Sequence, residues 1–481
     1  MKSIESYGRT KIICTLGPAS ARPEVLKGMI EAGMDIIRLN FSHGTHDEHR
    51  NLLTVVRQTS EKMGEHITIL QDLQGPRIRV GQLGKASVEL KNDEPLTITM
   101  EEVVGDEKRI STTYKNLVKD VNQGNRILID DGRIELKVLG VKESDVFCRV
   151  VTGGPLKSYK GMNFPGASIS APALTEKDKD DLEFGLANDI DYVALSFVRK
   201  AEDVRELRDF IAGKGPKGRK VPIIAKIERG EAVDCFDAIL TEVDGVMVAR
   251  GDLGVELPSE DVPMVQKMII RKCNEGGKPV IIATQMLESM IENPRPTRAE
   301  ASDVANAVLD GADAVMLSGE TSVGNHPVEA VQIMDRIIRK AETQVQEGSP
   351  VEVEIMRNPV RDAVDAVGRA ACVLAKQVGA AAIVPLTYSG RSAQVVAKYR
   401  PKARIVAVTG GDKIVRRLNL YWGVRSIIVE QMSDFDGSLK LVLEKLLEAG
   451  HVQKRDYIVV TAGIPLMQMG TTNMVKVQKV E

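Results

Sequence analysis

Eight short apolar runs, most of them separated by helical patterns, limit the fold of this chain more than any other feature. They centre near Ile13, Ile37, Ile69, Val193, Ile224, Val246, Ile281 and Val315. Runs of this length suit strands that are buried on both faces. Strands alternating with helices predict either a (β/α)8 barrel or an open doubly wound sheet, and the count of eight favours the barrel.

Capping signals mark the start of two of the intervening helices. Thr297 and Glu300 have the spacing of a capping box, and a helical pattern runs from Arg298 to Leu309. The same spacing recurs at Thr45 and Glu48. We therefore expect helices to begin at both places.

Between about Gly75 and Ala171 the helical period disappears and short alternating strands replace it. In RILIDDGRIELKV, Asp131-Gly132 is the signal of a two-residue hairpin. We expect a small all-β unit inserted after the third barrel strand, serving either as a lid or as a passive decoration.

A third unit follows Ser349. A helix is expected from Asp362 to Gln377, before alternating strands and helices that predict a small doubly wound domain. The expected division is residues 1–75 and 172–349 for the barrel, 76–171 for the insert, and 350–481 for the C-terminal α/β domain.

Charge and composition exclude several function classes. The net charge is −2 with acids and bases interspersed, so bulk charge recruits no nucleic acid. The beginning, MKSIESYGRTKIICTLG, lacks a signal peptide's apolar stretch, and no run is long enough to cross a membrane. The five cysteines are scattered without a CxxC pair, as expected of small buried side chains in a reducing cytoplasm.

Polar residues recur at the carboxyl ends of the expected strands, where barrel enzymes carry their chemistry. They are Arg38, Asn40 and Ser42, then Asp72, then Lys226 and Glu228, then Arg250, Gly251 and Asp252, then Thr284, and finally Ser318, Gly319 and Glu320.

Two of these residues suggest a metal site. Glu228 and Asp252 end adjacent strands, and two carboxylates with open coordination positions suit Mg²⁺ or Mn²⁺. The absence of His and Cys among these strand-end residues disfavours zinc. The alternative is a buried ion pair without a ligand, either Lys226–Glu228 or Arg250–Asp252.

The same strand ends predict an anion site. Gly251 lets the backbone approach an anion, and the N–H groups of Gly251 and Asp252 would face it. Lys226, Arg38 and Arg79 add positive charge, which suits a phosphate or carboxylate. No GxxxxGK[ST] loop is present, so a nucleotide would bind in another way.

The stretch HGTHDEH holds three histidines, but its capping box favours a helix start over zinc. His43, just beyond a strand end, is placed to contact a ligand. His46 and His49 are expected to be solvated helix residues.

Together these motifs resemble those of the pyruvate kinase family over nearly the whole chain. The resemblance rests on RLNFSHG, KIE, MVARGDLGVE, ATQMLESM, NPRPTRAEASDVANAVLDGADAVMLSGET and SGRSA, in this order and spacing. It implies a (β/α)8 TIM barrel with an inserted small β-barrel lid domain and a C-terminal doubly wound α/β regulatory domain. It also implies transfer of a phosphoryl group from phosphoenolpyruvate to ADP in glycolysis, giving pyruvate and ATP through a metal-stabilised enolate.

The resemblance also implies roles for single residues. Glu228 and Asp252 would bind Mg²⁺ or Mn²⁺, and Gly251, Asp252 and Thr284 would hold the carboxylate end of phosphoenolpyruvate or pyruvate. The enolate would be protonated near Thr284, through water. Lys226 would face the bridging and transferred oxygens, while Arg38 would hold the moving phosphoryl group. The residues expected towards the nucleotide are Asn40, Ser42, His43, Arg79 and Lys160.

Potassium is a separate question. Family members that need potassium bind it through side chains and a carbonyl at the positions of Asn40, Ser42, Asp72 and Leu73. In the family that this chain resembles, the potassium-dependent members carry Glu at the position of Arg77. We hypothesise that the charge of Arg77 substitutes for potassium, the alternative being a surface arginine paired with the lid.

The segment TYSGRS resembles the family's loop for a phosphorylated effector, which implies allosteric regulation. Its residues are Thr387, Ser389, Gly390, Arg391 and Ser392. An ordinary strand–helix turn is the alternative. The later loop GIPLMQMGTTN, from Gly463, lacks the Trp-Arg pair that some members use for fructose 1,6-bisphosphate, which disfavours that effector. The family resemblance also implies a homotetramer.

Two other functions remain open from the residues. A metal-dependent carbon–carbon lyase on a related barrel would also use an acidic pair and an enolate. An inactive sensor of phosphorylated metabolites would keep the pocket without turnover, although the joint presence of Lys226, Glu228, Asp252 and Thr284 disfavours it.

Overall fold

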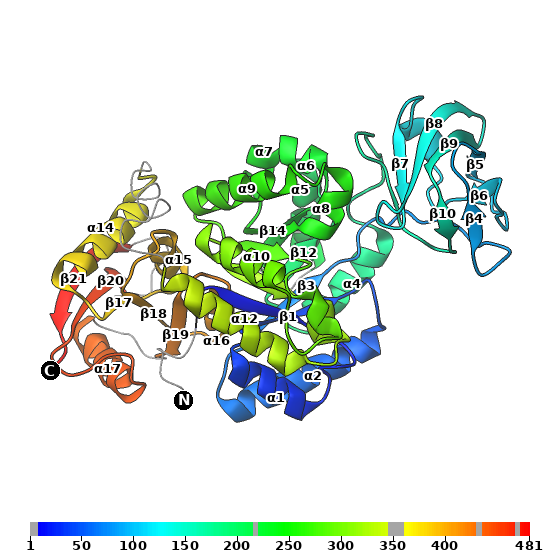
Figure 1. Ribbon diagram of the computed structural model, residues 1–481. Helices are drawn as coiled ribbons and strands as arrows, with labels where there is room; N and C mark the ends of the chain where they lie inside the picture. The colour runs from blue at the N-terminus through cyan, green and yellow to red at the C-terminus, as the bar shows by residue number, and fades with distance from the viewer. Residues whose placement is uncertain (1–7, 215–219, 345–359, 430–434, 467–471) are drawn as a thin grey trace.

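The computed structural model of the chain describes residues 8–214, 220–344, 360–429, 435–466 and 472–481. Three bodies follow one another along the molecule: a C-terminal sheet with its helices, a central barrel, and a small β unit at the other end (Figure 1).

The central body is a closed barrel of parallel strands in the order β1, β2, β3, β12, β13, β14, β15, β16. Their bounds are β1 Lys11–Thr15, β2 Ile36–Asn40, β3 Thr68–Asp72, β12 Tyr192–Leu195, β13 Ile223–Ile227, β14 Gly245–Ala249, β15 Val280–Ala283 and β16 Ala314–Leu317. Each of the eight apolar runs forms one of these strands. The predicted barrel is confirmed, and the open sheet is excluded for this part of the chain.

Helices surround the barrel because their apolar stripes pack on the outward faces of the strands in one continuous core. The longer ones are α1 Pro23–Ala32, α2 His46–Met63, α4 Glu176–Ala187, α5 Ala201–Lys214, α7 Phe236–Glu242, α9 Val262–Gly276, α10 Arg298–Leu309 and α12 Pro327–Glu342. Shorter ones follow strand ends: α6 Gly230–Asp234, α8 Arg250–Glu256, the 3-10 helix Glu288–Ile291 and α11 Gly319–Ser322. The capping boxes predicted at Thr45 and Thr297 are both formed.

The β unit leaves the barrel after β3 and returns before α4. It contains β4 Val88–Leu90, β5 Pro95–Thr99, β6 Arg109–Ser111, α3 Leu117–Asp120, β7 Arg126–Ile129, β8 Ile134–Lys142, β9 Asp145–Thr152, β10 Gly154–Leu156 and β11 Met162–Asn163. These strands form a six-stranded sheet and a two-stranded sheet around one core. The small β-barrel expected here is therefore built from two sheets rather than from one continuous closed sheet.

The predicted hairpin at Asp131-Gly132 exists, but its loop is longer than predicted. Ile129 pairs with Ile134, so four residues connect β7 to β8. Asp130, Asp131 and Gly132 all have positive φ. The two aspartates tolerate this left-handed backbone better than most residues, and the wider turn directs them towards the barrel side of the unit.

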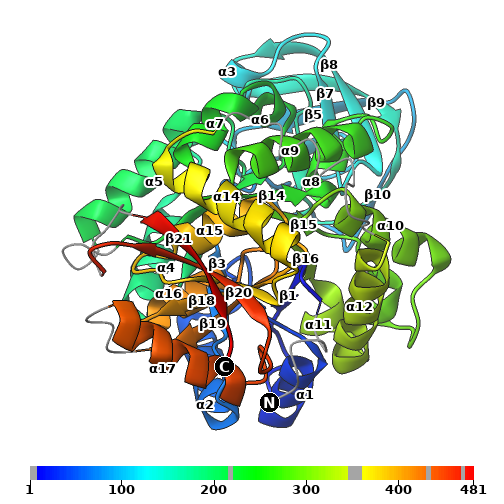
Figure 2. The same cartoon turned by 90° about the vertical axis from the view of Figure 1, so that its left-hand side faces the viewer.

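The C-terminal body is doubly wound, as predicted. Its sheet has the order β19, β18, β17, β20, β21, with only β21 antiparallel to its neighbour. Its elements are α14 Ala363–Val378, β17 Ala382–Pro385, α15 Arg391–Lys398, β18 Arg404–Thr409, α16 Asp412–Leu418, β19 Val424–Ile428, α17 Phe435–Glu448, β20 Tyr457–Gly463 and β21 Thr472–Lys479. Helices α14 and α15 pack on one face of the sheet and α17 on the other (Figure 2).

Two further sequence expectations, about membrane-spanning helices and about the burial of the cysteines, can be compared with the structure. No helix in the described ranges has both the length and the hydropathy needed to cross a membrane. Four cysteines are buried as expected, but Cys235 is exposed.

Candidate active site

The strand-end residues converge because parallel barrel strands all end on one side. Lys226 lies at the centre of the cluster. Its ammonium is 2.9 Å from Glu228 Oε1, 3.2 Å from Asp72 Oδ1 and 2.8 Å from Ser196 Oγ. Arg38 Nε lies 2.6 Å from the other Asp72 oxygen. Two cations and two carboxylates therefore form one nearly buried network.

The pKa values of this network show that the ions stabilise one another. Burial alone would raise the pKa of Asp72, but Lys226 and Arg38 lower it below its ordinary value. Burial alone would lower the pKa of Lys226, but Asp72 and Glu228 raise it. Lys226 is therefore a permanent cation at the end of β13.

Asp252, on α8 directly after β14, is the exception. Burial first, and then the charge of Glu228, raise the pKa of Asp252 to about 6. Its carboxylate has no hydrogen-bond or ion-pair partner among the described residues. Glu228 accepts an N–H from Phe197 at 2.7 Å, so a fixed carboxylate faces an uncompensated one.

This carboxylate pair fits a divalent cation. The described residues contain no group of three or more His, Cys, Asp or Glu side chains arranged for a metal. Mg²⁺ and Mn²⁺ commonly take one or two protein carboxylates and complete their coordination with water and substrate oxygens. Glu228 and Asp252 supply that number, and a bound cation would relieve their mutual repulsion.

Only one of the two ion pairs considered as alternatives to a ligand site is formed. Lys226 pairs with Glu228, whereas Arg250 pairs with Asp303 at 2.6 Å rather than with Asp252. Arg250 also donates to the carbonyl oxygen of Thr284 at 2.7 Å. Thr284 has φ 67, so this arginine supports a left-handed residue at the end of β15.

The predicted anion donors are arranged differently from the expectation. The N–H of Gly251 donates to Thr284 Oγ1 at 2.8 Å, and Thr284 donates in turn to its neighbouring carbonyl at 2.6 Å. Gly251 and Thr284 are thus adjacent, as expected, but in this arrangement the Gly251 N–H is occupied.

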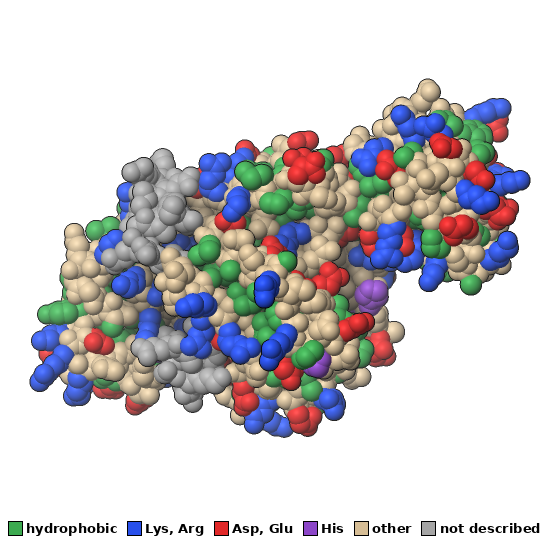
Figure 3. Space-filling model, in the orientation of Figure 1, with side chains coloured by type: hydrophobic (Ala, Val, Ile, Leu, Met, Phe, Trp, Pro, Cys, Tyr) green, Lys and Arg blue, Asp and Glu red, His purple; other side chains and the backbone are tan. Residues whose placement is uncertain are grey.

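Two of the five residues predicted to face a nucleotide, Arg79 and Lys160, lie between barrel and lid. A cavity of about 210 Å³ is lined by Arg79 and Lys160 together with Arg77, Arg229 and Asp252. Charged side chains gather on both sides of the hollow between the two bodies (Figure 3). Lys160 pairs with Asp130 at 2.7 Å, and Arg79 donates to Tyr159 O at 2.8 Å, so both are held by the lid.

Arg77 is exposed and has no ion pair within the described part of the chain, so the alternative pairing with the lid is absent there. Its charge lowers the pKa of His43, after the larger effect of burial. Nearby, Asn40 Oδ1 accepts the N–H of Ser42 at 3.2 Å. Two of the four expected potassium ligands already have partners. The Asp72 carboxylate forms ion pairs with Arg38 and Lys226, and the carbonyl oxygen of Leu73 accepts a hydrogen bond from Ser196.

The prediction for His49 is wrong, because this side chain is buried. Its ring stacks on Phe41 at 4.1 Å, and its Nε2 is 3.0 Å from His43 O. His46 is half-buried rather than solvated, and its Nε2 lies 2.7 Å from Asp181 Oδ1.

Sequence reasoning missed Ser196 and Thr15. Ser196 directly follows β12 and donates to Leu73 O at 2.6 Å while accepting from Lys226. Thr15 ends β1 and accepts from Arg38 at 3.0 Å. Both lie at carboxyl ends of barrel strands, so the polar-residue signal at strand ends marks them too.

The predicted effector loop connects β17 to α15. Thr387 Oγ1 accepts the N–H of Gly390 at 2.9 Å, which closes the turn. Arg391 pairs with Asp362, and the Ser392 and Thr472 hydroxyls lie 2.6 Å apart. Ser389 is exposed. Residues 467–471 of the later loop lie outside the described residues.

Comparisons with known proteins agree with this geometry. The family model described as pyruvate kinase, barrel domain, matches residues 7–331, and that of the pyruvate kinase alpha/beta domain matches residues 365–478. The chain is 47% identical over 474 residues to a pyruvate kinase of Clostridium acetobutylicum, covering 98% of this chain and 100% of the relative. It is 46% identical over 471 residues to that of Geobacillus stearothermophilus, covering 98% and 80%. A solved pyruvate kinase structure from Cryptosporidium parvum has a TM-score of 0.94 at 37% identity, covering 99% of this chain and 97% of that one.

Proposed function

The chain belongs to the pyruvate kinase family and transfers the phosphoryl group of phosphoenolpyruvate to ADP, giving pyruvate and ATP, and from this premise we propose which residues carry the reaction. Its family uses a metal cofactor, and we propose Mg²⁺ or Mn²⁺ held by Glu228 and Asp252. The observation that carries this proposal is the pair of carboxylates at the ends of the adjacent strands β13 and β14, where Asp252 has no side-chain partner among the described residues. When bound, the metal would neutralise charge on the substrate oxygens.

Lys226 and Arg38 act on the phosphoryl group. As the bond from phosphorus to the enol oxygen breaks, that oxygen gains negative charge, and the Lys226 ammonium stabilises it. Arg38, fixed by Asp72 and Thr15, holds the phosphoryl oxygens while a bond forms to the terminal oxygen of ADP. The enolate then takes a proton at its carbon on the side of Thr284, through water.

The remaining assignments are supported by position. Gly251, Asp252 and Thr284 hold the substrate carboxylate, which displaces the internal Gly251–Thr284 bond. The nucleotide lies in the cavity lined by Arg79 and Lys160 and towards Asn40, Ser42 and His43, beneath residues 76–171 acting as a lid. Because separate apolar cores support barrel, insert and C-terminal body, we propose the domain division expected from the sequence. The limit at residue 349 lies outside the described residues.

We further propose that the chain works in the cytoplasm as a homotetramer regulated by a phosphorylated effector at the loop 387–392. An apolar groove between α10 and α12, with a cavity of about 500 Å³, supports association with a second copy. Size-exclusion chromatography with light scattering tests the tetramer. No change in half-saturation by phosphoenolpyruvate with any phosphate would exclude the effector.

The experiment for the metal site measures ATP from phosphoenolpyruvate, ADP and Mg²⁺. Asp252→Asn and Glu228→Gln should each lose at least about 10²-fold in kcat and bind Mn²⁺ more weakly, since each removes one of two ligands. Asp47→Asn, on the exposed side of α2, is the control. Unchanged Mn²⁺ binding in both ligand variants would contradict the assignment. A lyase would turn over without ADP, and an inactive sensor would make no ATP.

A further inference from the structure

A short two-stranded stem joins the lid to the barrel. Backbone hydrogen bonds of 2.9 Å pair residues 78–80 of the outgoing chain with residues 160–162 of the returning chain. Arg79 lies opposite Gly161 in this antiparallel pairing. The stem therefore carries Arg79 and Lys160, two basic residues that line the cavity between barrel and lid.

The returning side of the stem is attached to a side chain of the barrel. Asn163, the last residue of β11, donates from its Nδ2 to Glu256 Oε1 at 3.2 Å. The backbone N–H of Phe164, the next residue, also hydrogen-bonds to Glu256. The side chain of Phe164 is fully buried in the apolar core of the lid. Glu256 therefore holds the base of the lid at a point that is continuous with its core.

Glu256 is the last residue of α8, the helix that directly follows β14 and carries Asp252 near its start. Leu253, fully buried, fixes α8 against the barrel. One end of this helix thus lies at the carboxylate pair proposed to bind the metal, and the other end holds the lid.

The stability of α8 does not explain an acid at this position. A negative charge in the last turn of a helix is unfavourable, because it faces the negative end of the helix dipole. Burial and then the charge of Glu231 also disfavour the ionised form and raise the pKa of Glu256. Arg229, directly after β13, acts in the opposite direction, as do Asn163 and Phe164 of the lid. The contacts that offset the cost of this carboxylate therefore include those that hold the lid.

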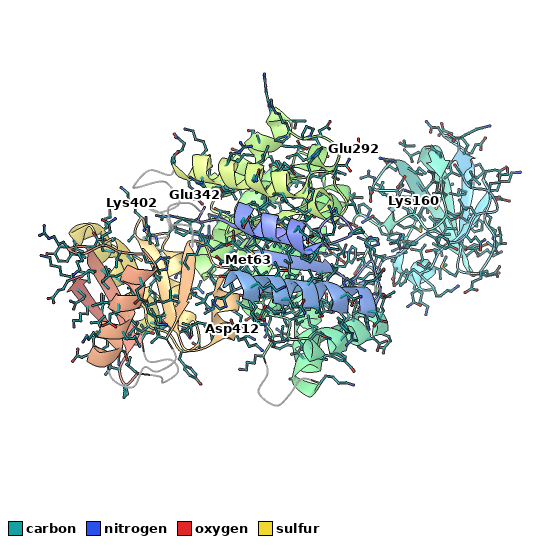
Figure 4. All side chains as sticks on the ribbon, turned by 90° about the horizontal axis from the view of Figure 1, so that it is seen from below. Met63, Lys160, Glu292, Glu342, Lys402 and Asp412 are labelled. Carbon is teal, nitrogen blue, oxygen red and sulfur yellow. The ribbon has the colours of Figure 1, made fainter. Side chains whose placement is uncertain are left out.

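We propose that Glu256 is a positioning residue for the nucleotide: through Asn163 it fixes the stem, and the stem keeps Arg79 and Lys160 over the cavity. Lys160 lies on the side of the lid that faces the barrel (Figure 4). The inference rests on the nucleotide site proposed above. Because Lys226 stays in place when this contact is lost, the effect falls on the KM for ADP more than on kcat.

Steady-state assays of ATP formation by the full chain test this role. Glu256→Ala should raise the KM for ADP about tenfold and change kcat by less than about threefold, because hydrogen bonds to a charged group are lost away from the reacting atoms. Glu256→Gln keeps an acceptor oxygen for Asn163, so its KM should stay within about threefold of the native value. Glu260→Ala, at an exposed position beyond α8, is the control and should leave both constants unchanged.

An exchange of the two partners separates positioning from a general loss of structure. Asn163→Asp places a second carboxylate beside Glu256 and should raise the KM for ADP about tenfold or more. Asn163→Asp/Glu256→Gln should return it to within about threefold of the native value, because the amide and the carboxylate have then exchanged places. The new carboxylate is present in both variants, so its direct repulsion of the nucleotide does not produce this recovery.

Lys160→Ala distinguishes failure of this inference from failure of the nucleotide site. A raised KM for ADP in Lys160→Ala, with native values in Glu256→Ala and Asn163→Asp, would overturn the positioning role alone. Native values in all three variants would contradict the nucleotide site as well. An exchanged pair with a KM no lower than that of Asn163→Asp would also overturn the role of Glu256.

Discussion

The ammonium of Lys226 donates to the hydroxyl oxygen of Ser196 across 2.8 Å. The hydroxyl of Ser196 in turn donates a hydrogen bond to the carbonyl oxygen of Leu73 at 2.6 Å. Both hydrogen-bonding directions of this hydroxyl are therefore used, and Lys226 is tied to the loop that follows β3. A metal bound by Glu228, as proposed above, would leave Ser196 and Asp72 to hold the ammonium in place.

Replacing Ser196 by alanine should lower kcat about tenfold while changing the KM for ADP by less than about twofold, because a hydrogen bond to a charged group contributes about 1.5–3 kcal/mol. Steady-state assays of ATP formation measure both constants. Ser60→Ala is the matched control, since that buried hydroxyl donates to Arg57 O at 3.0 Å on α2. Equal kcat in the Ser196 and Ser60 variants would remove Ser196 from the proposed mechanism.

Replacing Lys226 by methionine should cost at least about 10²-fold in kcat, because the charge that forms on the enol oxygen loses its fixed counter-charge. Mn²⁺ binding should persist, since Glu228 and Asp252 remain. Electron paramagnetic resonance of bound Mn²⁺, alongside turnover, separates these effects. A variant with turnover within a few-fold of the native rate would contradict the assignment.

The barrel and part of its site were predictable from local pattern. Buried strands need apolar runs, and a ligand site at the strand ends needs polar residues immediately after them, so Lys226, Glu228 and Asp252 could be found. Capping boxes mark helix starts through contacts within four residues, and both predicted boxes are formed.

The remaining contacts depend on neighbours that are distant in sequence. β12 pairs with β3 only because the whole insert leaves and returns between them, and that pairing brings Ser196 to Leu73. Arg250, directly after β14, reaches Asp303 on α10, the helix between β15 and β16. His49 has the helical spacing of a solvated residue, but the chain turn at His43 places its ring against Phe41.

Activity should be nearly independent of potassium if Arg77 supplies the positive charge. In tetramethylammonium buffer, added potassium should change kcat by less than about twofold, because a fixed charge already occupies the region near His43 and Asp252. Arg77→Glu should make activity depend on potassium, whereas Arg77→Lys should not. A large potassium stimulation of the native enzyme would refute the substitution of one charge for the other.

Lys11 should make stability depend on pH. Its side chain is fully buried between barrel and C-terminal body, where it donates to Val424 O at 2.8 Å and lies 3.7 Å from Asp35. Burial and then Arg425 lower the pKa of Lys11 from 10.5 to about 7. Between these values the unfolded chain binds a proton that the folded chain lacks, so folded stability rises with pH.

The Lys11→Met variant removes this titration. From pH 7 to pH 9 the native chain should gain about 2 kcal/mol of stability relative to the variant, since each pH unit in this window contributes about 1.36 kcal/mol. Loss of the bond to Val424 O affects the variant equally at every pH, so the readout is the change in the difference between melting temperatures. Lys91→Met, at an exposed lid position, should show a constant difference. Parallel melting curves for the native chain and Lys11→Met across this range would show that Lys11 keeps its proton in the folded state.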